Sequence, residues 1–157
     1  MKKALKIIAL ILFLVFIGIQ FVRPARINKH IVPEQTLEAN AQVPEDIQRI
    51  FQKSCNDCHT NQTNWRWYSE IAPMSWGMVE HVEDGRAELN FSEWTSYETS
   101  RKRRKLDEIC EQVQTKEMPL NQYVWVHWSA KLSDVEIKIV CDWTEAERAR
   151  LESLESK

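Results

Sequence analysis

The chain has 157 residues, a length that suits one domain with a hydrophobic core. Its composition is ordinary for a globular protein, and a formal net charge of −2 gives no electrostatic reason to expect nucleic-acid binding. Only three glycines leave little for an all-β fold rich in tight turns. Seven tryptophans with so few glycines suit helices packed around a large flat ligand, although tryptophan is also ordinary core material.

The N-terminus predicts an export segment. Lys2, Lys3 and Lys6 precede an apolar run over residues 7–19, and a basic region followed by an apolar stretch is typical of an export signal. Since no small-x-small cleavage site follows, we predict an uncleaved signal anchor over residues 1–22, with a cleaved signal peptide as the alternative. The anchor would make the chain a single-pass protein of the inner (cytoplasmic) membrane.

A tether and then the main domain are expected after this segment. Residues 23–43 are polar, carry two prolines and show no periodicity, which predicts a tether. The domain over residues 44–157 opens at Pro44, a favourable first helical position. Apolar residues recur at helical spacing from Ile47 to Cys55 and predict an amphipathic helix.

The most informative motif lies at the end of that helix. Cys55-Asn56-Asp57-Cys58-His59 has the form C-x-x-C-H, the attachment signature of a c-type haem. Two thiols one helical turn apart can add to the two vinyl groups of one porphyrin, and the next imidazole then ligates the iron. We predict one covalent haem on Cys55 and Cys58, with His59 as the proximal axial ligand.

Three other meanings of a C-x-x-C pair stay open. A zinc site needs two more closely spaced ligands; the remaining cysteines are far apart in sequence, although histidines could complete a set. A thioredoxin-like redox pair requires a preceding strand, whereas a helix is expected here. A plain disulfide would leave His59 unexplained. The export segment favours haem, which is attached outside the cytoplasm, so the domain would face the periplasm.

Helices dominate the rest of the chain. A loop is expected over residues 60–67, a short helix over residues 74–83 that stops near Gly85, and a longer helix over residues 98–115. The longer helix should end before Met118, because a residue that precedes proline resists the α conformation. No pair of strands is evident, so the fold class is mostly α.

The last helix has a clear start and carries one of two cysteines that we expect to pair. Ser133 and Glu136 form a capping box, a typical helix N-terminus. Cys110 and Cys141 lie on the apolar faces of two predicted helices, and disulfides persist in oxidising compartments. We predict that they pair, with two buried free thiols as the alternative.

The iron needs a sixth ligand or an open site. Met118 is the best candidate, because Pro119 restrains it in a loop just before the final helix. A core methionine is the alternative role. His81 and His127 are rival ligands, and an open or water-bound site also remains possible.

One strong basic run occurs in the chain, over residues 101–105. It could dock an acidic redox partner through electrostatic steering. A solvated helix face is the simpler interpretation.

With these residues in view, the chain resembles the haem-binding-domain family of short, membrane-anchored bacterial c-type cytochromes. The resemblance covers most of residues 44–143, and its central Gly-Arg…Leu-Asn-Phe-Ser stretch is its most particular part. It is carried by the C-x-x-C-H motif, His81-Val82, Gly85-Arg86, Leu89-Asn90-Phe91-Ser92-Glu93-Trp94, Met118-Pro119-Leu120, Tyr123, His127, Leu132-Ser133-Asp134 and Trp143.

The resemblance implies a small cytochrome c-like helical domain. It also implies covalent haem on Cys55 and Cys58, with His59 as proximal and Met118 as distal ligand, as in single-haem class I cytochromes. The tryptophan-rich segment before Trp94 departs from the smallest members of that class.

The leading functional hypothesis is a single-haem electron carrier, tethered to the inner membrane, that serves redox partner proteins near the membrane and is not an enzyme. The alternative is a haem-based sensor or small haem enzyme with a displaceable sixth ligand. A third possibility is an interaction domain in which haem only completes the core.

Overall fold

The computed structural model describes residues 1–155, and within that range the chain is mostly helical, as predicted, with no strand. The α-helices are α1 (Lys2–Ile19), α2 (Leu37–Asn40), α3 (Glu45–Ser54), α4 (Asn56–His59), α5 (Met74–Glu88), α6 (Thr99–Gln114), α7 (Asn121–Val126) and α8 (Asp134–Glu155). The 3₁₀ helices are η1 (Pro33–Gln35), η2 (Trp67–Glu70), η3 (Phe91–Ser96) and η4 (Trp128–Ala130).

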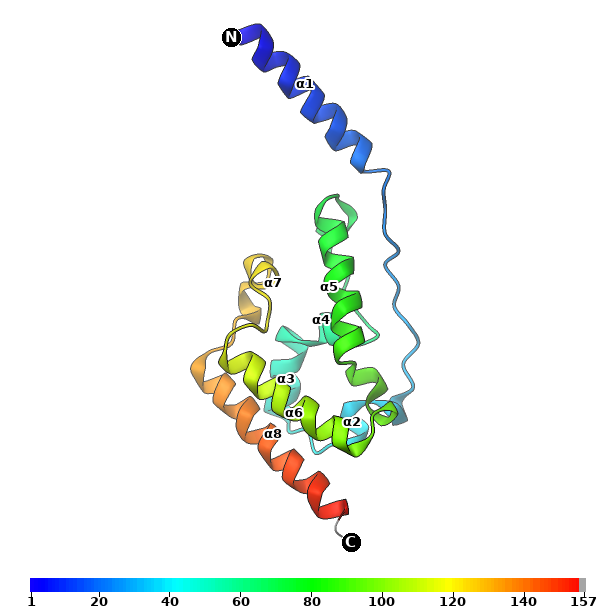
Figure 1. The fold of residues 1–157 in the computed structure, drawn as a ribbon, viewed down its shortest axis with the longest axis vertical. Helices are drawn as coiled ribbons and strands as arrows, with labels where there is room; N and C mark the ends of the chain where they lie inside the picture. The colour runs from blue at the N-terminus through cyan, green and yellow to red at the C-terminus, as the bar shows by residue number, and fades with distance from the viewer. Residues whose placement is uncertain (156–157) are drawn as a thin grey trace.

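The core lies where α3, α6 and α8 meet. α6 and α8 run side by side (Figure 1), and a disulfide between Cys110 and Cys141 joins them. Phe51 of α3 stacks on Phe91 with ring centroids 5.0 Å apart and meets the edge of Trp143 of α8 at 5.3 Å. These contacts fix α3, and with it the start of the C-x-x-C-H segment, on the core.

The basic run over residues 101–105 lies on α6, where ion pairs within the chain engage much of it. Arg103 pairs with Glu152 at 3.7 Å and with Glu155 at 3.4 Å, both on α8. Lys105 is buried. The run therefore helps to join α6 to α8, a role that the sequence pattern did not indicate.

Helix boundaries agree with the sequence at α6 and α8 and differ at α3 and α5. The capping box at α8 is confirmed, since Ser133 N donates to Glu136 Oε2 at 2.9 Å and Glu136 N donates to Ser133 Oγ at 3.3 Å. α3 ends before Cys55, and the other four residues of the motif form a separate turn, α4, with Cys55 as its N-cap. α5 continues through Gly85 to its end at Glu88, so the predicted stop near Gly85 is wrong.

The prediction of an N-terminal membrane helix over residues 1–22 is wrong. The helix found there is α1, and no helix in residues 1–155 is long and apolar enough to cross a membrane. Three lysines occupy the first part of α1, which leaves an apolar stretch of about 13 residues. At 1.5 Å per residue it measures about 20 Å, short of a hydrocarbon core of about 30 Å. The predicted location, single-pass in the inner membrane with the domain facing the periplasm, is overturned by the same finding.

The segment predicted as a tether, residues 23–43, lies along the helical body (Figure 1). Arg26 Nη1 donates to the carbonyl of Ser69 at 2.6 Å, and Asn28 exchanges two hydrogen bonds of 3.0 Å with the backbone of Thr63. Leu37 is fully buried in the core. Polar side chains that the sequence pattern associates with solvent thus bind backbone groups of the body.

Candidate functional site

The C-x-x-C-H segment folds as one helical turn that carries both thiols and the imidazole. Cys58 N and His59 N both donate to the carbonyl of Cys55, at 3.1 and 3.0 Å. Cys55 and Cys58 are free, half-buried thiols. The turn therefore presents three donor side chains from five consecutive residues.

Two adjoining cavities meet at this turn. The inner cavity, of about 330 Å³, is lined mainly by apolar side chains of the core, including Phe51 and Phe91. The outer cavity, of about 310 Å³, adds Cys58 and more polar groups. Four residues line both cavities: Cys55, His59, Glu88 and Met118. The predicted attachment site and the predicted distal ligand thus share one hollow.

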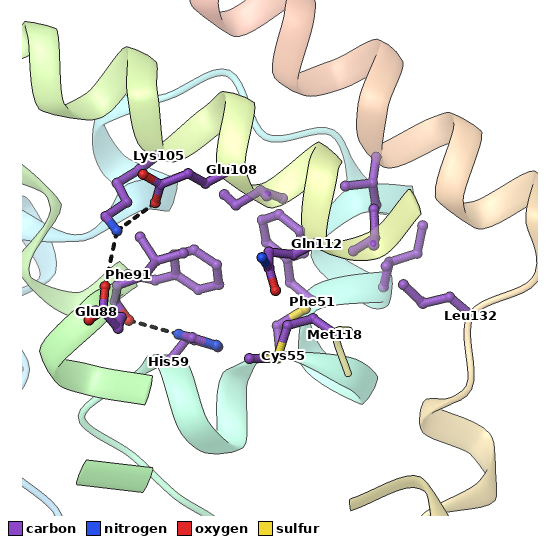
Figure 2. A pocket seen from close by; sticks show the side chains of 15 residues that line it. Phe51, Cys55, His59, Glu88, Phe91, Lys105, Glu108, Gln112, Met118 and Leu132 are labelled. Atoms are coloured by element: carbon purple, nitrogen blue, oxygen red, sulfur yellow. Dashed lines mark hydrogen bonds and ion pairs between the residues drawn. The ribbon is translucent and has the colours of Figure 1, made fainter. Parts of the chain in front are cut away.

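His59 is held in a form suited to metal ligation. Its Nδ1 lies 2.9 Å from the carbonyl of Leu89, and because a carbonyl only accepts, Nδ1 carries the proton and donates. Desolvation by the surrounding protein lowers the pKa of His59, so the ring is neutral at pH 7. The lone pair then resides on Nε2, and Figure 2 shows the His59 ring projecting into the inner cavity that it lines. A backbone carbonyl on Nδ1 is a usual partner of a ligating histidine.

The segment that follows His59 is fastened by side chains of α5 and of Asn90, the residue just before η3. Arg86 Nε donates to the carbonyl of Thr60 at 2.7 Å, and its Nη2 donates to Thr63 Oγ1 at 3.0 Å. The buried Asn90 Nδ2 donates to Asn61 Oδ1 at 2.9 Å. These contacts give the Gly-Arg and Leu-Asn-Phe-Ser stretches a physical role: they orient the C-x-x-C-H turn.

Gly85 allows α5 to approach α4. A Cβ on Gly85 would lie 2.8 Å from the carbonyl oxygen of Cys58, closer than a side-chain carbon can come to a rigid backbone. Gly77, on the same helix, has nothing within 4 Å of its would-be Cβ. The glycine that the sequence pattern associates with a helix end is required for close packing instead.

We expect Gly85→Ala to destabilise the fold and Gly77→Ala to stabilise it. Overpacking at Gly85 should cost about 1–3 kcal/mol, whereas Gly77→Ala should gain about 0.5–1 kcal/mol because alanine is the better helix former. Urea unfolding of the two variants measures both effects. A gain in stability from Gly85→Ala would contradict the close approach of α4 and α5.

The two thiols are protected in the folded chain without haem. Burial, with a smaller effect of Cys58, raises the pKa of Cys55 to about 12, and burial with the neighbouring Asp57 raises the pKa of Cys58 to about 11. At pH 8 the Cys55 thiolate is then about 10³-fold rarer than that of an ordinary cysteine. We expect alkylation of the thiols in the folded, haem-free chain to be slow, and its rate to keep rising with pH up to about pH 11. The rate is measured by quenching the reaction at set times and determining the mass of the chain. Urea-unfolded chain, the control, should level off near pH 9.

The structure separates the candidates for the distal position. Met118 lines both cavities, and its backbone N–H donates to the carbonyl of Gln112 at 3.0 Å. His81 lines the outer cavity only. His127 lines neither cavity; its Nε2 lies 2.6 Å from the hydroxyl of Tyr68, and its Nδ1 lies 3.1 Å from the carbonyl of Tyr123.

One contact of the motif was missed by the sequence reasoning. The hydroxyl of the buried Tyr123 donates to Asp57 Oδ2 at 2.8 Å, which ties α7 to the C-x-x-C-H turn. Tyr123 also lines the outer cavity. The signal for it was present, because Tyr123 is one of the residues that carry the family resemblance.

The alternatives for the cysteine pair find little support. Within residues 1–155, no group of three or more His, Cys, Asp or Glu side chains is placed to hold a metal ion, as a zinc site of these residues would require. The helix α3, and no strand, precedes Cys55. Cys55 and Cys58 are not joined to each other.

Comparison with known proteins identifies the family. No curated protein and no solved structure matches the chain significantly. A family model, the haem-binding domain, matches residues 14–146, a stretch that contains the C-x-x-C-H turn, α5 and Met118. Since the match covers well over half of the chain, the chain belongs to the haem-binding-domain family and is a haem-binding protein.

Proposed function

We propose that the chain is a single-haem c-type cytochrome that carries electrons. One observation carries the proposal: the free thiols of Cys55 and Cys58, the neutral His59 and the thioether of Met118 line two adjoining and mainly apolar cavities. A haem ring needs apolar surroundings. A covalently attached haem with two axial ligands also needs two thiols for the thioether bonds and two side chains that can ligate the iron. The residues present therefore fit the group.

Cys55 and Cys58 would hold the haem covalently. Each Sγ–H adds across one vinyl double bond: a carbon–sulfur bond forms, and the thiol hydrogen goes to the other vinyl carbon. No oxidant is needed, because the addition is redox-neutral. Two such bonds from one helical turn fix the ring beside His59.

His59 and Met118 would fill the two axial positions. The iron supplies one-electron exchange between Fe(II) and Fe(III), and a methionine ligand raises its potential relative to two histidines. Phe51, Phe91 and the other apolar residues of the inner cavity would keep water from the metal. With both positions filled there is no vacancy for a substrate, which favours exchange of electrons with a partner protein over catalysis.

A second candidate is a haem-based sensor or small haem enzyme in which Met118 is displaced. One observation favours it. A further cavity, of about 420 Å³, lies against Met118 and Pro119 and is lined by Val124, Trp125 and Leu132. It could take up the methionine side chain if another ligand replaced it on the iron.

Spectroscopy separates the two functions. The full-length chain is produced in a host that matures c-type cytochromes, and oxidised and reduced spectra are recorded with and without carbon monoxide. A sulfur-to-iron charge-transfer band and no carbon monoxide binding support the carrier. Avid binding of carbon monoxide by the unaltered chain would favour the sensor.

A further inference from the structure

Lys105 is a buried cation in the wall of the inner cavity. It belongs to α6 and is 7% exposed. Among the residues that line the inner and outer cavities, it is the only lysine or arginine in the described part of the chain. A buried charge is costly unless it is paired, so the ammonium group of Lys105 needs anionic partners at this cavity.

The partners of Lys105 within the chain leave part of its ammonium group available. Nζ donates to Glu108 Oε2 at 2.6 Å and to Glu88 Oε2 at 3.4 Å. An ammonium carries three N–H donors, so these two contacts leave one. The side chains of Glu88 and Glu108 are 79% and 40% exposed, so water solvates both carboxylates while the lysine is shielded.

The place of Lys105 matches the shape of a haem. Lys105 and Cys55 both line the inner cavity, and Figure 2 shows them apart from each other, with Phe91 between them. A haem carries its vinyl groups on one half of the ring and two propionate carboxylates on the other. If Cys55 and Cys58 fix the vinyl half, which is the proposed function on which this step rests, the propionate half extends away from them.

We propose that Lys105 binds a haem propionate through its free N–H, with Glu108 holding the ammonium in place. A carboxylate buried against Phe91 and other apolar side chains needs such a cation. The competing interpretation is an ion pair that only fastens α6 to α5. Removal of the charge should change the infrared bands of the propionates and the reduction potential of the haem if Lys105 binds a propionate. It should leave the propionate bands unchanged if Lys105 only joins the two helices.

The test uses full-length, haem-loaded chain and three variants. Lys105→Met removes the charge and keeps the packing, and Lys105→Arg keeps the charge. Arg104→Met is the matched control, because Arg104 is exposed, pairs with the same Glu108 at 3.5 Å and does not line the cavities. Two quantities are measured: the reduction potential, and the carboxylate bands in redox-difference infrared spectra of haem labelled with ¹³C at the propionates.

We expect Lys105→Met to lower the ratio of reduced to oxidised haem at a fixed electrode potential about tenfold, equivalent to 59 mV for one electron. A nearby positive charge favours Fe(II), and its loss favours Fe(III). The labelled propionate band should shift in Lys105→Met and also in Lys105→Arg, because a guanidinium binds a carboxylate differently. Lys105→Arg should restore the potential, and Arg104→Met should change neither quantity.

An unshifted propionate band in both Lys105 variants would overturn the proposal. If Lys105→Met fails to fold, the propionate band in Lys105→Arg alone decides.

If the unaltered chain carries no covalent haem, the proposed function fails separately. Titration with haem and with its dimethyl ester, which lacks the charges, then tests Lys105. Weaker binding of the ester to the unaltered chain, and equal binding of both to Lys105→Met, would support the contact; equal binding of both to the unaltered chain would overturn it.

Discussion

Replacing Cys55 and Cys58 together with serine is expected to abolish covalent haem. The hydroxyl of serine does not add to a vinyl group as a thiol does, so no bond would survive unfolding. Denaturing gels stained for haem, with intact mass spectrometry, measure the loss. Each single replacement should leave one thioether and one unreacted vinyl group, which the spectrum of the pyridine complex distinguishes from two thioethers.

The matched control is the pair of serine replacements at Cys110 and Cys141. This variant loses the disulfide that closes a loop with a sequence separation of 31 residues. It should be about 3–4 kcal/mol less stable by the loop-entropy relation, yet it should carry covalent haem in full. Haem that stays attached to the Cys55→Ser, Cys58→Ser chain would refute attachment at the motif.

Met118→Ala is expected to change the ligation and the reduction potential of the iron and to leave the covalent attachment of the haem unchanged. The sulfur-to-iron charge-transfer band should disappear, carbon monoxide should bind, and the reduction potential should fall by on the order of 0.1 V, well within the span that axial ligands control. Absorption spectra and electrochemical titration measure these effects. Covalent haem should remain at the unaltered level.

Met78→Ala is the matched control for this variant, because Met78 lines the outer cavity but not the inner one. It should keep the charge-transfer band. If the band survived Met118→Ala, or if the axial signature were lost in His81→Ala instead, the distal ligand would be assigned wrongly.

Local sequence signals predicted those parts of the fold that depend on local physics. The capping box at Ser133 predicted where α8 begins, and the helical spacing of apolar residues predicted α6 to within one residue at each end. The C-x-x-C-H motif predicted a cluster of donors, and Met118 does line the same hollow as His59. Haem binding, expected from the motif, is confirmed by the family match.

Other features could not be predicted because they depend on contacts between distant segments. Gly85 is indistinguishable in sequence from a helix terminator until Cys58 is placed against it. Lys105 lies within a basic run, and only the packing of α6 shows that it is buried. The membrane helix is a different case: the three lysines that shorten the apolar part of α1 are visible in the sequence, and the prediction gave too little weight to the length of the apolar run.

The most direct test of the account is the intact mass of the full-length chain under denaturing conditions, after production in a host that matures c-type cytochromes. We predict the mass of the polypeptide plus one haem, with the added mass on the proteolytic peptide that contains Cys55 and Cys58. A chain at the mass of the bare polypeptide, or haem on any other peptide, would contradict covalent attachment at this motif.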